Sequence, residues 1–443
     1  MDVSNVCPRS PSAVRTVRKT AMTFLMLAAL APDSAVAQAL SLQDAVAAAT
    51  QRAPILLARD ASRQARSEDL ARADALPDPT LIVGVQNFPI GGPDAYTLNR
   101  DRMTMQRIGL TQALPSRAKR NARRELASAL LDQASADAVT TTLDVQRATA
   151  KAWVLLWAAQ HEREQLQDLR AQVALAERTA EARLAGGGGT AGDALATRAS
   201  ELQLLNRIDD ADARIAQARA GLQRWLGDAD VDVMAAPPDF SSAPMSETRL
   251  LAQLDQQGPL LAWDAREASA DAALALARAE KRPDWSISGG IAKRGGGGSN
   301  VVWLEVGVGL PLFPGNRQDR GISARSADRV AVHASREDAR RMQTEAVRRA
   351  FARWQALGTQ VTRTRDSLLP LAHDRSRIAL AAYSGGAALQ PWLDARRDEI
   401  DARTDYAALL GQWGQAWAEL AYLLPSTDIA STASHARLPE IAQ

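Results

Sequence analysis

Two kinds of hydrophobic pattern divide this chain. Over most of its length apolar residues recur at intervals of three and four, which is the spacing of one face of a helix. Residues 80–115 and 285–314 differ, because each stretch holds two segments rich in β-branched and aliphatic side chains around a loop rich in turn-forming residues. We interpret each stretch as a β-hairpin. The expected strands are residues 80–88, 103–112, 285–293 and 301–310.

The expected strands alternate between apolar and polar positions. The odd-numbered residues of 81–85 and the even-numbered residues of 302–310 are all apolar, so each set shares one face of its strand. Arg107 and Glu305 also fall within strands, and a membrane strand would have to direct them into a watery lumen. Aromatic residues lie near strand ends, as in the interfacial girdle of a membrane barrel: Phe88, Trp285, Trp303 and Phe313.

Strand length leaves two interpretations open. Segments of about nine to ten residues match a tilted membrane-spanning strand, but two soluble hairpins packed on helices would have the same pattern. A barrel in hydrocarbon must close, and the smallest barrels have about eight strands. This chain offers only four, so membrane insertion would require about eight strands from two chains or twelve from three.

Long helices occupy the rest of the chain. Residues 117–184 contain neither Pro nor Gly and predict one helix of about 100 Å, at 1.5 Å per residue. Gly186–Gly189 would end this helix, and a second helix is expected over residues 191–226.

The second half of the chain predicts helices over residues 317–383 and 389–424, with a kink at Pro370. Apolar seams with coiled-coil spacing support the long helices of both halves. The seams are formed by Leu166, Leu169, Val173, Ala176 and Ala180, and by Val347, Ala350, Trp354, Leu357, Val361, Thr364, Leu368 and Leu371.

The two halves share one plan of helix, hairpin, long helix, Gly break and helix. Pro259 corresponds to Pro54 in the first helical segment, and Pro314 corresponds to Pro115 at the end of the hairpin. We therefore interpret the chain as two tandem repeats of one architectural unit. The expected divisions are a signal peptide at 1–37, a first repeat at 38–235, a linker at 236–245, a second repeat at 246–425 and a C-terminal tail at 426–443.

The N-terminus predicts export from the cytoplasm. Basic residues precede an apolar core at 21–30, and residues 35–37 form a small-x-small cleavage motif, so the mature chain is expected to begin at Gln38. The core is about half as long as a membrane-spanning helix. Cys7 is the only cysteine and would leave with the signal, so disulfides and thiol chemistry are not expected.

Composition argues against several functional classes. The chain has 53 Lys and Arg against 51 Asp and Glu, so it lacks the basic field that binding to nucleic acid needs. The glycine run at 186–189 lacks the Lys-Ser/Thr of a phosphate-binding loop. Neither a nucleophile–base constellation nor a metal-ligand cluster stands out, and the four histidines are scattered. We therefore expect no enzyme activity, no cofactor and no metal site.

The order of motifs resembles the TolC-type outer-membrane efflux channel family over the whole expected mature chain. The resemblance rests on the entry motif at 40–54, Leu-Pro-Asp-Pro before the first strand, QALPSRAKRNARRE, GLPLFPGNRQDRG and YSGGAALQPWLDARRDEIDARTDYAALLGQW. It implies a mainly α protein with membrane β: a homotrimer whose 12-stranded β-barrel lies among outer-membrane lipid and continues as an α-helical tunnel into the periplasm. The loops at 89–102 and 294–300 would face outside, and the Gly breaks near 186 and 385 would mark the periplasmic tip.

The resemblance also implies a function. The channel would be the passive exit duct of a tripartite efflux system, supplied by an inner-membrane pump of the RND type through a periplasmic adaptor. The chain looks most similar to heavy-metal members of the CusC and CzcC kind, and Met103 and Met105 are either soft ligands for a cation or plain apolar surface. Two alternatives stay open: the outer-membrane exit channel of a type I protein secretion system and, from a different class, a periplasmic coiled-coil scaffold or adaptor.

Acidic residues near the tip narrow and select the tunnel in this family. Asp193 and Asp394 match such positions, and Arg198 matches a basic position nearby. Pro391 stands where the family has a further acid, and the arginine that helps to lock the closed state has no counterpart, so we expect a gate that is held differently. Capping of a helix N-terminus after a Gly loop is an alternative role for both aspartates.

Overall fold

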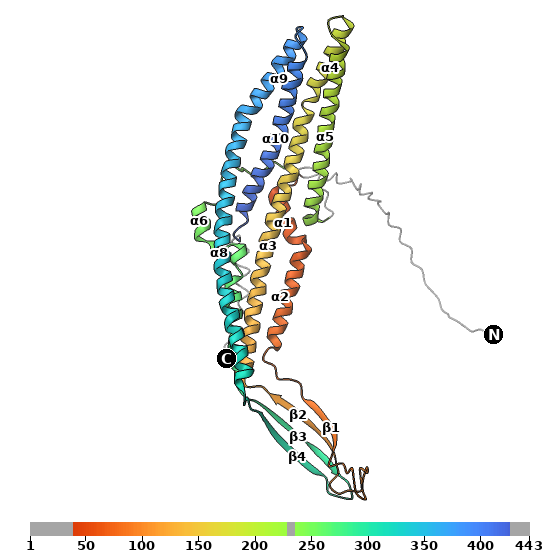
Figure 1. Ribbon diagram of the computed structural model, residues 1–443, viewed down its shortest axis with the longest axis vertical. Coiled ribbons are helices and arrows are strands. Elements are labelled where there is room, and N and C mark those ends of the chain that lie inside the picture. The colour runs from red at the N-terminus through yellow and green to blue at the C-terminus, as the bar shows by residue number, and fades with distance from the viewer. Residues whose placement is uncertain (1–38, 228–234, 426–443) are drawn as a thin grey trace, which may run out of the picture. The chain divides into compact units, whose positions relative to one another are not determined.

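The computed structural model describes residues 39–227 and 235–425, which belong to one unit that begins at Ala39 (Figure 1). The expected signal peptide and the expected C-terminal tail lie outside these residues. The described chain is mostly helical and contains one sheet, which agrees with the mainly α character expected from the sequence.

The same order of elements occurs in both halves of the described chain. The first half contains α1 (Leu42–Arg52), α2 (Pro54–Arg72), β1 (Thr80–Gln86), β2 (Met105–Leu114), α3 (Arg117–Gln167), α4 (Arg170–Ala185) and α5 (Ala191–Leu226). The second half contains α6 (Glu247–Ala252), α7 (Trp263–Ala279), β3 (Asp284–Arg294), β4 (Val301–Gly309), α8 (Gln318–Arg363), a π-helical turn (Thr364–Leu368), α9 (Leu369–Ser384) and α10 (Gln390–Ala421). Short 3₁₀ turns lie at Leu254–Gln256, Gly258–Leu260 and Pro314–Asn316.

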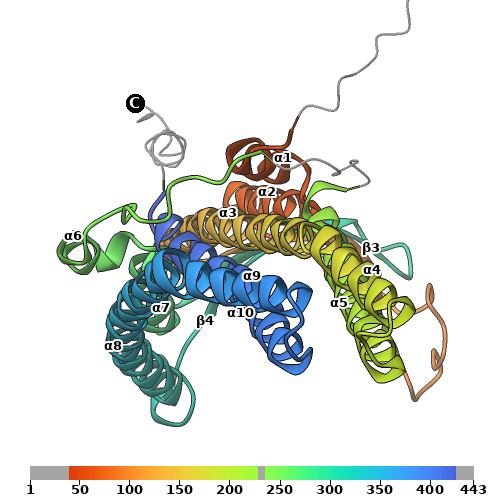
Figure 2. The same ribbon diagram turned by 90° about the horizontal axis from the view of Figure 1, so that it is seen from above.

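The long helices of this unit run side by side, and the sheet extends from one end of them (Figure 1). In the view along the helices, α10 packs against α3 and α8, and α5 packs against α3 (Figure 2). The largest buried cluster surrounds Trp153 of α3, whose Nε1 donates to the carbonyl oxygen of Leu40 (3.0 Å). The two halves of the chain therefore share one helical core.

The four strands form a single antiparallel sheet in the order β1-β2-β3-β4. The strands β2 and β3, which come from different halves, pair from Met105↔Arg294 to Leu114↔Trp285. The two expected hairpins are thus one sheet. The outer sides of β1 and β4 are its edges, and no other strand of the described chain pairs with them.

The second strand begins later than expected, at Met105, because the two residues before it belong to the loop. The backbone N–H of Met103 donates to Oδ1 of Asp101 (2.9 Å), and Oγ1 of Thr104 donates to the carbonyl oxygen of Asn87 (3.0 Å). Asn87 has a φ of 57°, a left-handed conformation that ends β1.

The helix expected over residues 117–184 is divided in the structure. It breaks between Gln167 and Arg170, where Nη2 of Arg396 donates to the carbonyl oxygen of Leu169 (3.0 Å). The same carbonyl oxygen also accepts from the backbone N–H of Val173 (3.2 Å), so the contact from α10 adds to the helical hydrogen bond, and sequence periodicity does not reveal it. The seam itself is confirmed, since all five of its residues are fully buried: Leu166, Leu169, Val173, Ala176 and Ala180.

Pro370 distorts the helix as expected, but through a π-helical turn at 364–368. Proline has no N–H to donate, and its ring crowds the carbonyl four residues earlier, so the preceding turn widens by one residue. The extra residue shifts the seam. Leu368 and Leu371, which the sequence placed in the seam, are 51% and 66% exposed, whereas Tyr383 is fully buried.

The segment expected to be a linker packs on the helices. The side chain of Phe240 is buried, and its carbonyl oxygen accepts a hydrogen bond from Nε1 of Trp354 (2.9 Å). Nε1 of Trp417 donates to the carbonyl oxygen of Ser242 (3.0 Å). Two indoles from different helices therefore hold this segment as a strap across the bundle.

A buried cluster of charges lies beside the break between α3 and α4. Arg396 and Glu399 of α10 are each 1% exposed, and Nη1 of Arg396 donates to Oε2 of Glu399 (2.7 Å). Nη2 of Arg403 donates to Oε1 of the same carboxylate (3.1 Å), and its Nη1 donates to the carbonyl oxygen of Gln165 (3.3 Å). These bonds join α10 to both sides of the break.

His373 of α9 completes the cluster, with Nδ1 3.0 Å from Oε1 of Glu399. Burial by itself raises the pKa of Glu399, but the hydrogen bond with His373 and the charges of Arg396 and Arg403 outweigh it. The net pKa of Glu399 is therefore lower than its ordinary value. A carboxylate with a lowered pKa stabilises the folded state while it is ionised.

We predict that Glu399→Gln lowers the free energy of unfolding by about 3–5 kcal/mol, because buried Arg396 loses its counter-charge. The stabilisation by Glu399 is present above its unfolded pKa of about 4.5 and is lost as the pH falls through the lower folded pKa. Thermal unfolding of the purified protein between about pH 7 and pH 3 should show the difference between wild type and variant shrinking below about pH 4.5.

The matched control is Asp398→Asn. Asp398 is the neighbour of Glu399 in the sequence, and this substitution breaks its exposed ion pair with Arg375. Exposed pairs contribute less than about 1 kcal/mol. Equal effects of the two substitutions would contradict a special role for the buried cluster.

Candidate functional site

The expected periplasmic tip consists of two glycine turns. Residues 186–190 connect α4 to α5, and residues 385–389 connect α9 to α10. Gly187 and Gly386 have φ angles of 73° and 109°, which side chains rarely tolerate. Glycine at these positions lets each helix pair reverse direction tightly.

Asp193 caps the helix that follows the first turn. Its backbone N–H donates to Oγ1 of Thr190 (3.0 Å), and the backbone N–H of Thr190 donates to Oδ2 of Asp193 (3.2 Å). This reciprocal pair is a capping box. The structure therefore gives Asp193 the capping role considered from the sequence, which leaves one carboxylate oxygen for other contacts.

Asp394 and Arg198 have other partners. Asp394 lies beyond the first turn of α10 and accepts a hydrogen bond from Nε2 of Gln390 (2.8 Å), so the capping alternative is wrong for this residue. Nη1 of Arg198 donates to Oε1 of Glu177 (3.0 Å) and pairs with Glu201, and these bonds and charges raise the pKa of Arg198. The three residues chosen from the sequence therefore have separate partners.

Arg183 is the tip residue that sequence reasoning missed. Its Nη1 donates to the carbonyl oxygens of Tyr383 (2.6 Å) and Ala387 (3.1 Å), and its Nη2 donates to those of Gly188 (3.1 Å) and Gly386 (3.4 Å). The guanidinium also lies over the ring of Tyr383, with Cζ 4.5 Å from the ring centroid. One side chain thus joins both glycine turns.

A sequence signal for this contact existed. Arg183 stands three residues before the first glycine run, and Ala382 stands at the same distance before the second. The first turn therefore has an arginine that the second lacks, and only the structure shows that it reaches across.

Tyr383 couples the two turns electrostatically. Burial raises the pKa of Tyr383, the negative charge of Asp193 raises it further, and Arg183 opposes the shift. Asp193 therefore acts on a residue of the second helix pair, although the two side chains belong to different halves of the chain.

The sheet has one apolar face that is exposed in the single chain. The pairing register places twelve apolar residues on it, each at least 38% exposed. They are Leu81, Val83, Val85, Ile108, Leu110, Trp285, Ile287, Ile291, Val302, Leu304, Val306 and Val308.

The opposite face is polar and contains both barrel charges chosen from the sequence, Arg107 and Glu305. Nη1 of Arg107 donates to Oε1 of Gln86 (2.8 Å). Trp303 also lies on this face, with its ring centroid 4.0 Å from Cζ of Arg107. The expected place of Trp303 in an interfacial girdle is therefore wrong, because its register directs it away from the apolar face.

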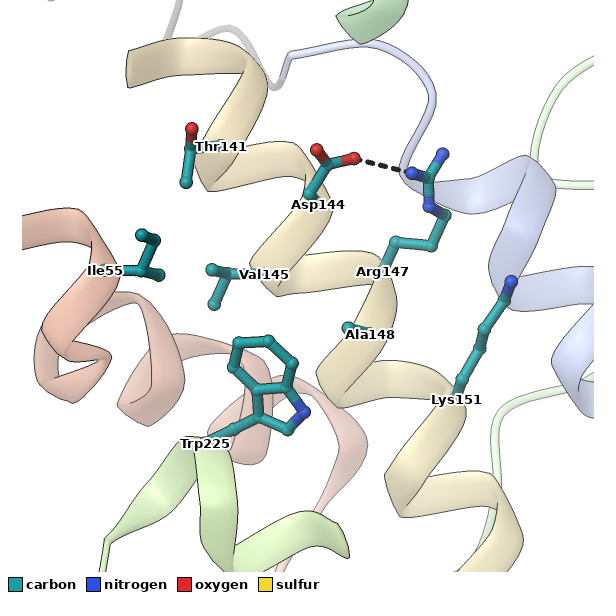
Figure 3. Close-up of a pocket in the computed structure, with 8 residues that line it drawn as sticks. All are labelled: Ile55, Thr141, Asp144, Val145, Arg147, Ala148, Lys151 and Trp225. Atoms are coloured by element: carbon teal, nitrogen blue, oxygen red, sulfur yellow. Dashed lines mark hydrogen bonds and ion pairs between the residues drawn. The ribbon is translucent and has the colours of Figure 1, made fainter. Parts of the chain in front are cut away.

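The structure also contains an open groove beside the N-terminus of α2, drawn in Figure 3. It has a volume of about 350 Å³, and Ile55 and Trp225 contribute to its apolar wall. Its cations have partners within the protein, since Arg147 pairs with Asp144 (2.5 Å) and Lys151 pairs with Glu419. We assign no ligand to this groove.

Other chemistry is sparse in the described residues. Within them no cluster of three or more His, Cys, Asp or Glu residues could hold a metal ion. His161 stacks on Trp157, and His333 pairs with Glu267. No helix in residues 39–227 or 235–425 is both long and apolar enough to cross a bilayer.

Comparison with known proteins finds a family match in the second half of the chain. Residues 252–425 match the family described as outer membrane efflux protein. No curated protein matches the chain.

Three solved structures illustrate the likeness of fold. A membrane protein from Pseudomonas aeruginosa is 18% identical, with a TM-score of 0.73 over 86% of this chain and 89% of its own. The CmeC outer membrane channel of Campylobacter jejuni is 14% identical, with a TM-score of 0.70 over 89% of this chain and 88% of its own. CusC, a protein whose structures show conformational changes that accompany folding and transmembrane channel formation, is 17% identical. Its TM-score is 0.69 over 87% of this chain and 92% of its own.

Residues 252–425 are similar to the outer membrane efflux protein family, and the chain as a whole has the fold of the outer-membrane channels that it resembles. The resemblance to the outer-membrane efflux channel family that the sequence suggested is confirmed. The expectation that the chain is not an enzyme agrees with this match, because the family consists of channels.

We predict that Arg183→Met loosens both glycine turns, because four carbonyl oxygens lose a charged donor. A hydrogen bond to a charged group contributes about 1.5–3 kcal/mol, so amide hydrogen exchange in 186–189 and 385–387 should accelerate at least about tenfold. Arg178→Met is the control, since Arg178 donates to Ala174 within its own helix. Acceleration in the first turn alone would contradict the link between the turns.

Proposed function

We propose that the chain is one subunit of a homotrimeric outer-membrane channel whose three sheets close into one twelve-stranded barrel. The observation that carries this proposal is the division of one sheet into an apolar and a polar face between two free edges. An apolar face of this extent is costly in water, whereas lipid covers it without cost. The polar face then lines a watery lumen.

The free edges support an assembly of several chains. Unpaired backbone N–H and C=O groups are not tolerated in hydrocarbon, so β1 of one chain must pair with β4 of another. Four strands from each of three chains give twelve. The likeness in fold to outer-membrane channels favours this number over an eight-stranded dimer.

The helices extend this duct in our proposal. The two halves, 38–235 and 246–425, act as tandem repeats joined by the segment 236–245, and their helices form a periplasmic tunnel below the barrel. The duct is passive, and an RND-type pump of the inner membrane and a periplasmic adaptor supply its substrates. The family match of the second half supports this assignment.

We further propose that the tip is the gate, with Asp193, Arg198 and Asp394 as its selective charges. The tip lacks the locking arginine expected from the family, and Arg183 holds the two turns together by another route. Heavy-metal cations are one cargo for this duct, by likeness to CusC. In the alternative assignment, the chain is the outer-membrane exit channel of a type I secretion system, and its cargo is protein.

We predict that Ile287→Arg and Ser288→Arg have opposite outcomes, since these neighbours lie on different faces of β3. An arginine on the lipid face costs about 2–4 kcal/mol near the bilayer midplane, so Ile287→Arg should deplete the trimer from the outer-membrane fraction. Ser288→Arg places its charge opposite Glu305 and should assemble normally. Carbonate washing followed by native electrophoresis measures both.

Release of the wild-type protein by carbonate would contradict the barrel and favour a periplasmic scaffold. Equal depletion by both substitutions would contradict the assignment of the two faces.

We predict that Asp193→Asn combined with Asp394→Asn weakens the cation selectivity of the channel in planar bilayers. Loss of two carboxylates per subunit should lower the cation-to-anion permeability ratio at least about twofold, as read from reversal potentials. Asparagine can still accept the capping hydrogen bond at 193, so the fold is retained. Asp398→Asn removes an exposed carboxylate elsewhere on α10 and is the control; an unchanged ratio in the double variant would remove both residues from the gate.

A further inference from the structure

The polar face of the sheet has its charges in a definite order along the strands. Arg294 and Arg107 lie toward the hairpin loops, at register positions opposite Met105 and Gly84. Glu305 lies four register positions nearer the helices than Arg107. Asp284 lies at the helix end of β3 and is paired with Lys119 (2.7 Å). The loop end of this face is therefore cationic.

A chain of contacts across all four strands holds Arg107 against the sheet. The indole of Trp303 on β4 reaches across β3 to β2, where Gly109 has no side chain to block it. A Cβ at Gly109 would lie 2.5 Å from Cζ2 of Trp303, so glycine is required there. Arg107 then covers the indole and donates to Gln86 on β1.

The partners of Arg107 in this arrangement are neutral. An aromatic ring and an amide oxygen orient the guanidinium without cancelling its charge. No carboxylate of the described residues forms an ion pair with Arg107, and its Nε is buried without a hydrogen-bond partner. A cation that is fixed in place and uncompensated attracts anions from solution.

We propose that Arg107, supported by Trp303 and Gln86, forms an anion-attracting site on the wall of the exit section, which favours negatively charged solutes at the loop end. Trp303 is a positioning residue, because its ring centroid lies 4.0 Å from Cζ of Arg107. This inference rests on the proposed function, because it requires the polar face to line the lumen. It adds a selective element far from the tip charges.

A single cysteine beside Arg107 can report the local charge. Gly84 is the cross-strand partner of Arg107, and a Cβ built there meets no atom within 4 Å. We would introduce Gly84→Cys into the full chain with Cys7→Ser and treat outer-membrane vesicles with anionic sulfonatoethyl or cationic trimethylammonioethyl methanethiosulfonate. The readout is the rate of the anionic reagent divided by the rate of the cationic reagent, and this ratio is normalised to the same ratio for a free thiol in solution.

At low salt we expect the anionic reagent to react about three- to tenfold faster than the cationic one, because the positive charge of Arg107 lies only several ångströms from the thiol. Adding Arg107→Gln should abolish this preference, and Arg107→Lys should retain most of it because the charge remains. Equal ratios with and without Arg107→Gln would overturn the inference.

Val83→Cys separates this test from the proposed function. Val83 lies on the apolar face, so neither charged reagent should reach it in lipid. Reaction at Gly84→Cys with protection at Val83→Cys is the pattern that the barrel requires. Any other pattern would overturn the barrel and the inference with it, whereas a barrel pattern with an unchanged rate ratio would overturn the inference alone.

Discussion

The structure depends on one constraint: its four-stranded sheet has two free edges and an exposed apolar face, which nothing in the described residues of this chain covers. The edge strands leave backbone donors and acceptors without partners, and the apolar face has no helix packed over it. In our proposal one arrangement solves both problems, because other copies pair with the edges while lipid covers the face. The helices, by contrast, already share a core within one chain.

The helical part achieves its cohesion through polar contacts as well as packing. Indole N–H groups hold the strap at Phe240 and Ser242, and the Arg396–Glu399 cluster joins α10 to the break after α3. Buried ion pairs add little stability over apolar packing but penalise every arrangement that separates them. An alignment of α10 that separated Arg396 from Glu399 would therefore be costly.

The comparisons show how little sequence identity this architecture requires. Channels that are only 14–18% identical to the chain share its fold over most of their length. The spacing of apolar residues and the positions of Gly and Pro are sufficient to specify long helices and hairpins, and many side chains satisfy the same spacing.

The sequence by itself determined the elements, because helix and strand patterns are local. It predicted the hairpins, the α5 bounds and the buried seam from Leu166 to Ala180. Tertiary structure alone decided the break after Gln167, the contact of Trp303 with Arg107 and the reach of Arg183 between the two glycine turns. Each of these three features depends on a partner that is distant in the chain. The spacing of neighbouring residues does not encode such partners.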